Sequence, residues 1–82
     1  MADSAALLPA AIPPPMLTKR SFTIQGHRTS IALEPEFWSA FDDAVADDQT
    51  TPTHWVATLD EARTTPLASA IRVELLKRAK AR

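Results

Sequence analysis

The segment HRTSIALEPEFW, residues 27–38, constrains the fold more than any other part of the chain, because its hydrophobic period changes at one proline. Before Pro35 the side chains alternate, so that Thr29, Ile31 and Leu33 share one face of a short strand. After Pro35 the apolar residues follow the 3.6-residue period of a helix. A single strand leaves backbone N–H and C=O groups unpaired, and the simplest partner is the same strand of a second copy.

A second alternating segment, residues 20–25, precedes this strand and carries Phe22 and Ile24 on one face. Its apolar residues are even-numbered, whereas those after Gly26 are odd-numbered, and a slip of one residue exchanges the faces of a strand. Either a bulge or bend at Gly26 restores the faces, or the first segment is a separate arm that packs elsewhere. A hairpin is not expected, because a two-residue loop of the Asn-Gly type is absent.

Three helices are predicted after the strand, over residues 35–47, 52–62 and 66–79. Each begins at a proline, which suits the first turn of a helix because its missing N–H would have had no partner there. Thr51 precedes the second helix and is a favourable N-cap residue. The chain is therefore predicted to be mostly α-helical, with one short strand at residues 27–33.

One small domain, residues 19–82, follows a segment with a different composition. Residues 1–18 hold four of the seven prolines, and we expect a disordered tail there. A domain of this size buries too little surface to be comfortably stable alone, which favours a dimer. We expect the core of that dimer to contain Thr29, Ile31, Leu33, Phe37, Phe41, Val45, Trp55, Leu59 and Ile71.

Charge is segregated along the chain although the formal net charge is only −1. Residues 19–33 carry +3, residues 34–62 carry −8, and residues 63–82 carry +5. A polyanion would therefore meet the two basic ends rather than the acidic middle.

Composition argues against several classes of function. The chain has no cysteine and two histidines, so we expect neither a metal site nor a cofactor. No apolar run approaches the ~18 residues of a membrane span, and the start of the chain lacks the features of a signal peptide. Asp47 and Asp48 are adjacent acids, but no nucleophile accompanies them, so we expect no enzyme. A soluble, cytoplasmic protein that does not bind a membrane is the resulting expectation.

The order strand, helix, turn, helix, together with GHRTSIALEPEFW at residues 26–38, resembles the ribbon-helix-helix family of DNA-binding proteins. A bacterial subgroup of that family is the most similar, and LASAIRV at residues 67–73 resembles its C-terminal helix. The resemblance covers residues 19–80. It implies an intertwined homodimer with a two-stranded antiparallel intersubunit ribbon and an extra C-terminal helix. In this family the ribbon enters the major groove of double-stranded DNA, as in the Met and Arc repressors.

The resemblance also implies which residues contact DNA. On the solvent face of the strand the base contacts would be Arg28, Ser30 and Ala32. Arg28 can pair with guanine O6 and N7, and Ala32 can touch a thymine methyl group. Phosphate contacts would come from the arm before the strand and from the start of the second helix, and comprise Lys19, Arg20, Thr51, Thr53 and His54.

Two hypotheses of function follow. The first is a dimeric, sequence-specific transcriptional regulator, such as a repressor of its own operon or an antitoxin. The alternative is a ribbon-helix-helix dimer that binds another protein through its acidic helices or its C-terminal helix, as an antitoxin-like module or adaptor. The residues also have purely structural interpretations, since Arg28 can flank a dimer strand and Ser30 can be a small surface residue. Basic side chains gathered on one face, with the acids behind, would favour DNA.

Overall fold

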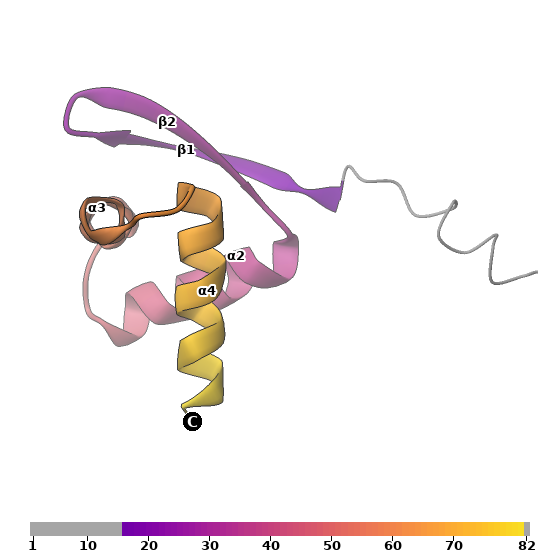
Figure 1. The fold of residues 1–82 in the computed structure, drawn as a ribbon. Helices are drawn as coiled ribbons and strands as arrows, with labels where there is room; N and C mark the ends of the chain where they lie inside the picture. Colours follow the sequence, from indigo (N-terminus) through magenta and orange to yellow (C-terminus); the bar gives the residue numbers. More distant parts are fainter. Residues whose placement is uncertain (1–15, 82) are drawn as a thin grey trace, which may run out of the picture.

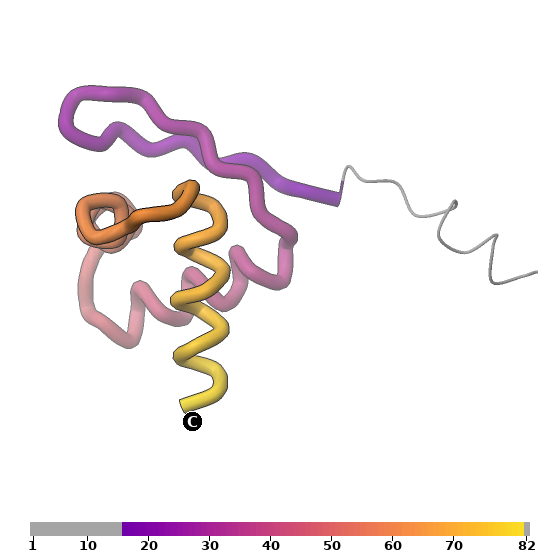
Figure 2. The backbone as a smooth tube through the Cα atoms, viewed as in Figure 1, coloured from indigo at the N-terminus to yellow at the C-terminus, as the bar shows by residue number. Residues whose placement is uncertain are grey.

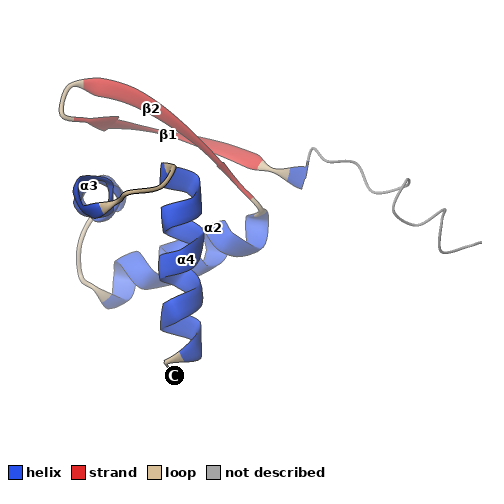
Figure 3. Ribbon diagram, viewed as in Figure 1, coloured by secondary structure: helices blue, strands red, loops and turns tan. Residues whose placement is uncertain are grey.

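The structure, a computed structural model, describes residues 16–81 as a two-stranded antiparallel sheet followed by three helices (Figures 1 and 3). The elements are β1 (Thr18–Ile24), β2 (His27–Leu33), α2 (Pro35–Asp47), α3 (Pro52–Ala62) and α4 (Leu67–Lys80). All three helices lie on one side of the two-stranded ribbon, and α4 crosses α2 (Figure 1). Most of the tail predicted for residues 1–18 lies outside the described residues, and its last residue begins β1.

β1 and β2 form a hairpin within one chain, so the predictions of a single strand and of no hairpin are wrong. The connecting turn contains only Gln25 and Gly26, and Figure 2 shows the chain reversing there. Both residues have positive φ, 51° and 82°, as a two-residue turn of the I′ type requires. Glutamine is an uncommon residue at the first of these positions, and for that reason the sequence carries no Asn-Gly signal.

The register of the hairpin accounts for the change of parity at Gly26. Phe22 pairs with Thr29 and Ser21 pairs with Ser30, so even residues of β1 share a face with odd residues of β2. Phe22 and Ile24 consequently lie on the inner face of the ribbon and are buried against the helices. No bulge is present, and residues 20–25 are not a separate arm.

A hydrophobic core between the ribbon and the helices is completed by residues of this one chain. The side chains of Leu33, Phe41, Val56 and Ile71 are 0% exposed. The Phe41 ring makes edge-to-face contacts with the two tryptophans, at 5.2 Å between centroids in each case. Of the residues predicted for a dimer core, Ile31, Leu33, Phe41, Val45, Trp55 and Ile71 are buried here, Phe37 and Leu59 pack against this core, and Thr29 is partly exposed.

Two polar contacts attach β1 to α2. Trp38 Nε1 donates a hydrogen bond of 2.7 Å to the backbone oxygen of Thr18. Arg20 lies on the inner face and donates hydrogen bonds of 2.9 and 3.2 Å to the two carboxylate oxygens of Asp42. Its guanidinium carbon is also 4.6 Å from the centroid of the Trp38 ring. The hydrogen bonds from Arg20 lower the pKa of Asp42 below its usual range.

Substitution of Gly26 tests the turn. A Cβ added there would meet no atom within 4 Å, so any cost arises from the positive φ of 82° rather than from a clash. We expect Gly26→Ala to reduce the free energy of unfolding by about 1 kcal/mol. Gly26→Asn should lose less, because asparagine tolerates this conformation. Urea denaturation measures both variants, and a Gly26→Ala protein as stable as the wild type would contradict the turn conformation.

The Arg20–Asp42 pair predicts how stability depends on pH. The folded-state pKa of Asp42 lies below its ordinary value of 3.8, so the pair contributes its full stability above about pH 4 and loses it as pH falls through the lowered pKa. We expect Asp42→Asn to reduce the free energy of unfolding by at most about 1 kcal/mol at pH 7, since the pair is partly exposed.

Below the lowered pKa of Asp42, the variant and the wild type should be equally stable. Asp43→Asn is the matched control, because the neighbouring side chain is exposed and has no ion pair among the described residues. Urea denaturation over a series of pH values, from pH 7 downward, measures the difference. A loss from Asp42→Asn that stays constant as the pH falls would contradict this role for the pair.

Candidate nucleic-acid interface

The outer face of the ribbon is the side directed away from the helices (Figure 1). It is formed by three cross-strand pairs: Lys19 with Ala32, Ser21 with Ser30, and Thr23 with Arg28. Ala32 is partly buried and the other five residues are exposed. The three base-contact residues predicted from the sequence therefore lie together on this face, with Lys19 beside them. The face contains no carboxylate.

Two cationic side chains lie on this outer face, and neither has an acidic partner within residues 16–81. Four other arginines of the described part of the chain each lie within 4.0 Å of a carboxylate: Arg20, Arg63, Arg72 and Arg78. Among the described residues Arg28 has no such pair, and neither does Lys19. No carboxylate of the described residues offsets their charges, whereas each of the other four arginines has a carboxylate beside it.

Small hydroxyl side chains occupy the middle of the outer face. Ser21 Oγ and Ser30 Oγ are 3.2 Å apart and share a hydrogen bond. Ser21 and Thr23 were not among the predicted contact residues, because they belong to the strand whose pairing was not recognised. Their alternation with Phe22 and Ile24 is the signal that could have identified them.

Arg20 is separated from this face. The sequence predicted a phosphate contact for it, but its side chain lies on the inner side of the ribbon and is held by Asp42 and the Trp38 ring. The alternation of a strand places neighbouring Lys19 on the opposite face. The structure thus separates two residues that the sequence suggested would act together.

The start of α3 carries the other residues predicted to contact phosphate. Thr51 caps the helix, since its Oγ1 accepts a hydrogen bond of 3.1 Å from the His54 N–H. The Thr51 carbonyl accepts another from the Trp55 N–H, and Pro52 has no N–H to donate. The Thr53 amide is the one left outside these bonds in the first turn. The side chains of Thr51, Thr53 and His54 are exposed.

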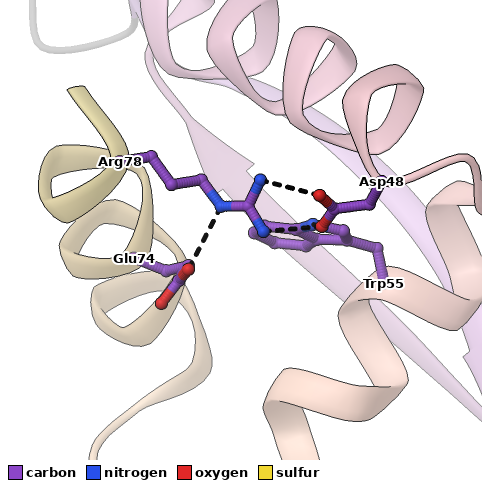
Figure 4. Close-up of polar contacts among 4 residues, drawn as sticks. All are labelled: Asp48, Trp55, Glu74 and Arg78. Carbon is purple, nitrogen blue, oxygen red and sulfur yellow. Dashed lines mark hydrogen bonds and ion pairs between the residues drawn. The ribbon is translucent and has the colours of Figure 1, made fainter. Parts of the chain in front are cut away.

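A network of hydrogen bonds and ion pairs compensates the negative charge of Asp48, which lies close to the start of α3 (Figure 4). Arg78 of α4 donates hydrogen bonds of 3.1 and 2.6 Å to Asp48, and the Trp55 Nε1 donates a third of 3.1 Å. Arg78 Nε also donates to Glu74 at 3.1 Å. The hydrogen bonds from Arg78 lower the pKa of Asp48. Because Asp48 and Arg78 are 30 residues apart, no local pattern in the sequence indicated this network.

A metal-binding cluster and a membrane-spanning helix are both absent from residues 16–81. No group of three or more histidine, aspartate or glutamate side chains is placed to hold a metal ion there. Among the helices described, none has the length and apolar character needed to cross a membrane.

Comparison with known protein families gives a match to the ribbon-helix-helix domain over residues 17–79, which spans the ribbon and nearly all of α4. No curated protein and no solved structure matches the chain. Ribbon-helix-helix domains are generally DNA-binding regulators of transcription that typically form dimers, and they are not enzymes. The match covers most of the sequence. The antiparallel ribbon followed by three helices, described above, is consistent with a ribbon-helix-helix fold. This chain belongs to the ribbon-helix-helix domain family.

Proposed function

We propose that this protein is a sequence-specific DNA-binding regulator of transcription, most simply a repressor, that reads the major groove with the outer face of its ribbon. The observation that carries the proposal is the presence of Arg28 and Lys19 on an exposed face that has no carboxylate, where neither has an acidic partner in the part of the chain that the structure describes. The major groove of B-DNA is about 12 Å wide and admits a two-stranded ribbon. Because the proposed target is DNA and the sequence resembles a bacterial subgroup of the family, the proposal places the protein in the cytoplasm of a bacterial cell.

Four side chains of the outer face have a role under this proposal. Arg28 donates two hydrogen bonds to O6 and N7 of a guanine, and Ser30 contacts a base edge. Ala32 packs against a thymine methyl group. Lys19 contacts phosphate, as do Thr51, Thr53 and His54 at the start of α3. Arg20 is given no part, because a phosphate would have to displace Asp42.

We propose further that the active form is a homodimer in which β2 pairs with β2 of a second copy. A two-residue turn makes Ile24 and His27 a hydrogen-bonded pair, and such pairs alternate along an antiparallel ladder. The N–H and C=O groups of Arg28, Ser30 and Ala32 are therefore directed away from β1. No strand covers that edge of β2 within the described residues. An open edge of this kind is ready to accept another strand.

The residues of β2 are compatible with antiparallel self-pairing. With the two-fold axis at Ser30, Arg28 of one chain lies opposite Ala32 of the other, so no like charges face each other. On the inner face Thr29 lies opposite Ile31. This register would add six backbone hydrogen bonds, two for each of the three outward-directed residues.

The dimensions of such a sheet suit the proposed DNA contacts. Neighbouring strands are about 4.8 Å apart, so the two β1 strands at its edges would be about 14 Å apart. The central β2 pair, which carries Arg28 and Ser30, could then enter a groove about 12 Å wide. Lys19 on the outer strands would lie near the phosphates along both sides of the groove.

One observation favours a second candidate, a module that binds another protein through α4. Val73 and Leu76 on this helix are 49% and 56% exposed, although most large apolar residues of the described chain are buried. The absence of DNA binding would favour this candidate over the regulator.

Substitution of Arg28 tests the DNA proposal. We expect Arg28→Ala to weaken specific binding about tenfold or more, because the guanine contact is lost. Arg63→Ala is the matched control, since that arginine is paired with Asp60 and lies off the ribbon, and it should bind as the wild type does. Fluorescence anisotropy with genomic and random duplexes, over a salt series, measures both.

Salt should weaken binding steeply, in proportion to the phosphates neutralised. Lys19→Ala should weaken binding equally for all sequences and reduce the salt slope. The regulator proposal fails if no duplex binds at low salt, or if Arg28→Ala and Arg63→Ala have the same affinity.

Proline at position 30 tests the dimer. The Ser30 N–H is directed away from β1, so Ser30→Pro should leave the hairpin intact and block pairing with the second copy. We expect twice the chain mass of 9.0 kDa for the wild type at micromolar concentration, and a folded monomer for the variant. Thr29→Pro is the control, because its N–H belongs to the ladder with β1, and it should disrupt the fold. Light scattering and circular dichroism report both. A monomeric wild type, or a dimeric Ser30→Pro protein, would contradict the proposed interface.

A further inference from the structure

A cleft of about 540 Å³ lies between α3 and the C-terminal half of α4, beside the turn that joins α2 to α3. Trp55, Leu59 and Ala62 of α3 give it an apolar wall, and Asp48, Glu74 and Arg78 are its charged residues. This volume falls within the range of about 300–1,000 Å³ found for sites that bind small molecules. None of its lining residues belongs to the ribbon, and His54 is the one lining residue that is also a proposed DNA contact.

The charged residues leave this cleft with a surplus of negative charge. Arg78 is held by two carboxylates, because its Nε donates to Glu74 Oε2 and its terminal nitrogens donate to Asp48 (Figure 4). One guanidinium between two carboxylates gives a net charge of −1. The second oxygen of Glu74, Oε1, has no hydrogen-bond partner among the described residues. The unused capacity of the cleft is therefore that of an acceptor for a positively charged donor.

We propose that this cleft binds a small organic cation, a protonated amine attached to an aromatic or aliphatic body. The ammonium group hydrogen-bonds to Glu74 Oε1, while the body packs against Trp55 and Leu59. Such a ligand uses both properties of the site, the apolar wall and the surplus charge. A carboxylate of the same shape would place like charges together and would bind less well.

Three probes of matched shape test the proposal with the full-length protein: 2-phenylethylamine as the cation, 2-phenylethanol as the neutral form and 3-phenylpropionate as the anion. Two-dimensional ¹H–¹⁵N NMR at pH 7 follows each titration. The amine should give saturable shifts at the Trp55 indole N–H and at residues 58–62. The Trp38 indole N–H, which is bonded to Thr18 O, should not move. The anion should bind at least about tenfold more weakly than the amine.

Variants identify the site. Glu74→Gln should weaken binding of the amine about tenfold and leave that of 2-phenylethanol unchanged, whereas Glu36→Gln on the exposed first turn of α2 should change neither. Thr58→Trp, at an exposed position that lines the cleft, should fill it and abolish binding. The proposal is overturned if the amine causes no saturable shift, if the anion binds as well as the amine, or if Glu74→Gln has no more effect than Glu36→Gln.

Discussion

The two-residue turn at Gln25 and Gly26 is the constraint on which the rest of the structure depends. It fixes the register of the hairpin, in which Ile24 pairs with His27 and Thr18 pairs with Leu33. This register decides which side chains of β1 share a face with which side chains of β2. Phe22 and Ile24 are thereby directed into the core, and Lys19 joins Arg28 on the opposite face. A turn one residue longer would exchange the faces of β1, bringing the charged side chain of Lys19 inward and exposing Phe22.

The distribution of arginine partners divides the molecule into two electrostatic regions. On the helical side, arginines lie against carboxylates, and Arg20 and Arg78 each connect elements that are distant in the sequence. These pairs are partly exposed, so they contribute more to the relative position of the elements than to overall stability. On the outer face of the ribbon, no carboxylate or aromatic ring of the described residues lies beside Arg28. The net charge of −1 conceals this difference, which depends on the fold rather than on composition.

The helical part of the fold could be predicted from local patterns, because a proline stands at or just before the start of each helix and each helix presents an apolar stripe. The third helix begins at Leu67, one residue later than predicted, with Pro66 as its N-cap. The resemblance carried by residues 26–38 identified the family correctly. The hairpin could not be recognised in the same way, since the identity of Gln25 does not indicate a positive φ. The change of parity at Gly26 was the available signal, and we interpreted it as a bulge or a separate arm. Because the hairpin was not recognised, the position of Arg20 on the inner face of the ribbon was not predicted either.

Contacts between residues that are far apart in the sequence could not be predicted from local sequence patterns. The pairing of Asp48 with Arg78 depends on how α4 packs across the other helices, and neither residue has a neighbour that predicts it. The same holds for the cleft beside Trp55, which is lined by residues of the α2–α3 turn, α3 and α4. Residue types suggested what Arg28 and Lys19 could bind, whereas only the structure shows that neither is paired with a carboxylate of residues 16–81.

The central claim is that β1 and β2 pair within one chain and so create the outer face. Nuclear Overhauser measurements on a mixture of isotope-labelled and unlabelled protein test it most directly, because they separate contacts within a chain from contacts between chains. Ser21 and Ser30 lie opposite each other in a non-hydrogen-bonded pair, where the α-protons are close. We expect a strong contact between their α-protons within the labelled chain, and none between labelled and unlabelled chains. A Ser21–Ser30 contact seen only between chains, or not seen at all, would contradict the claim.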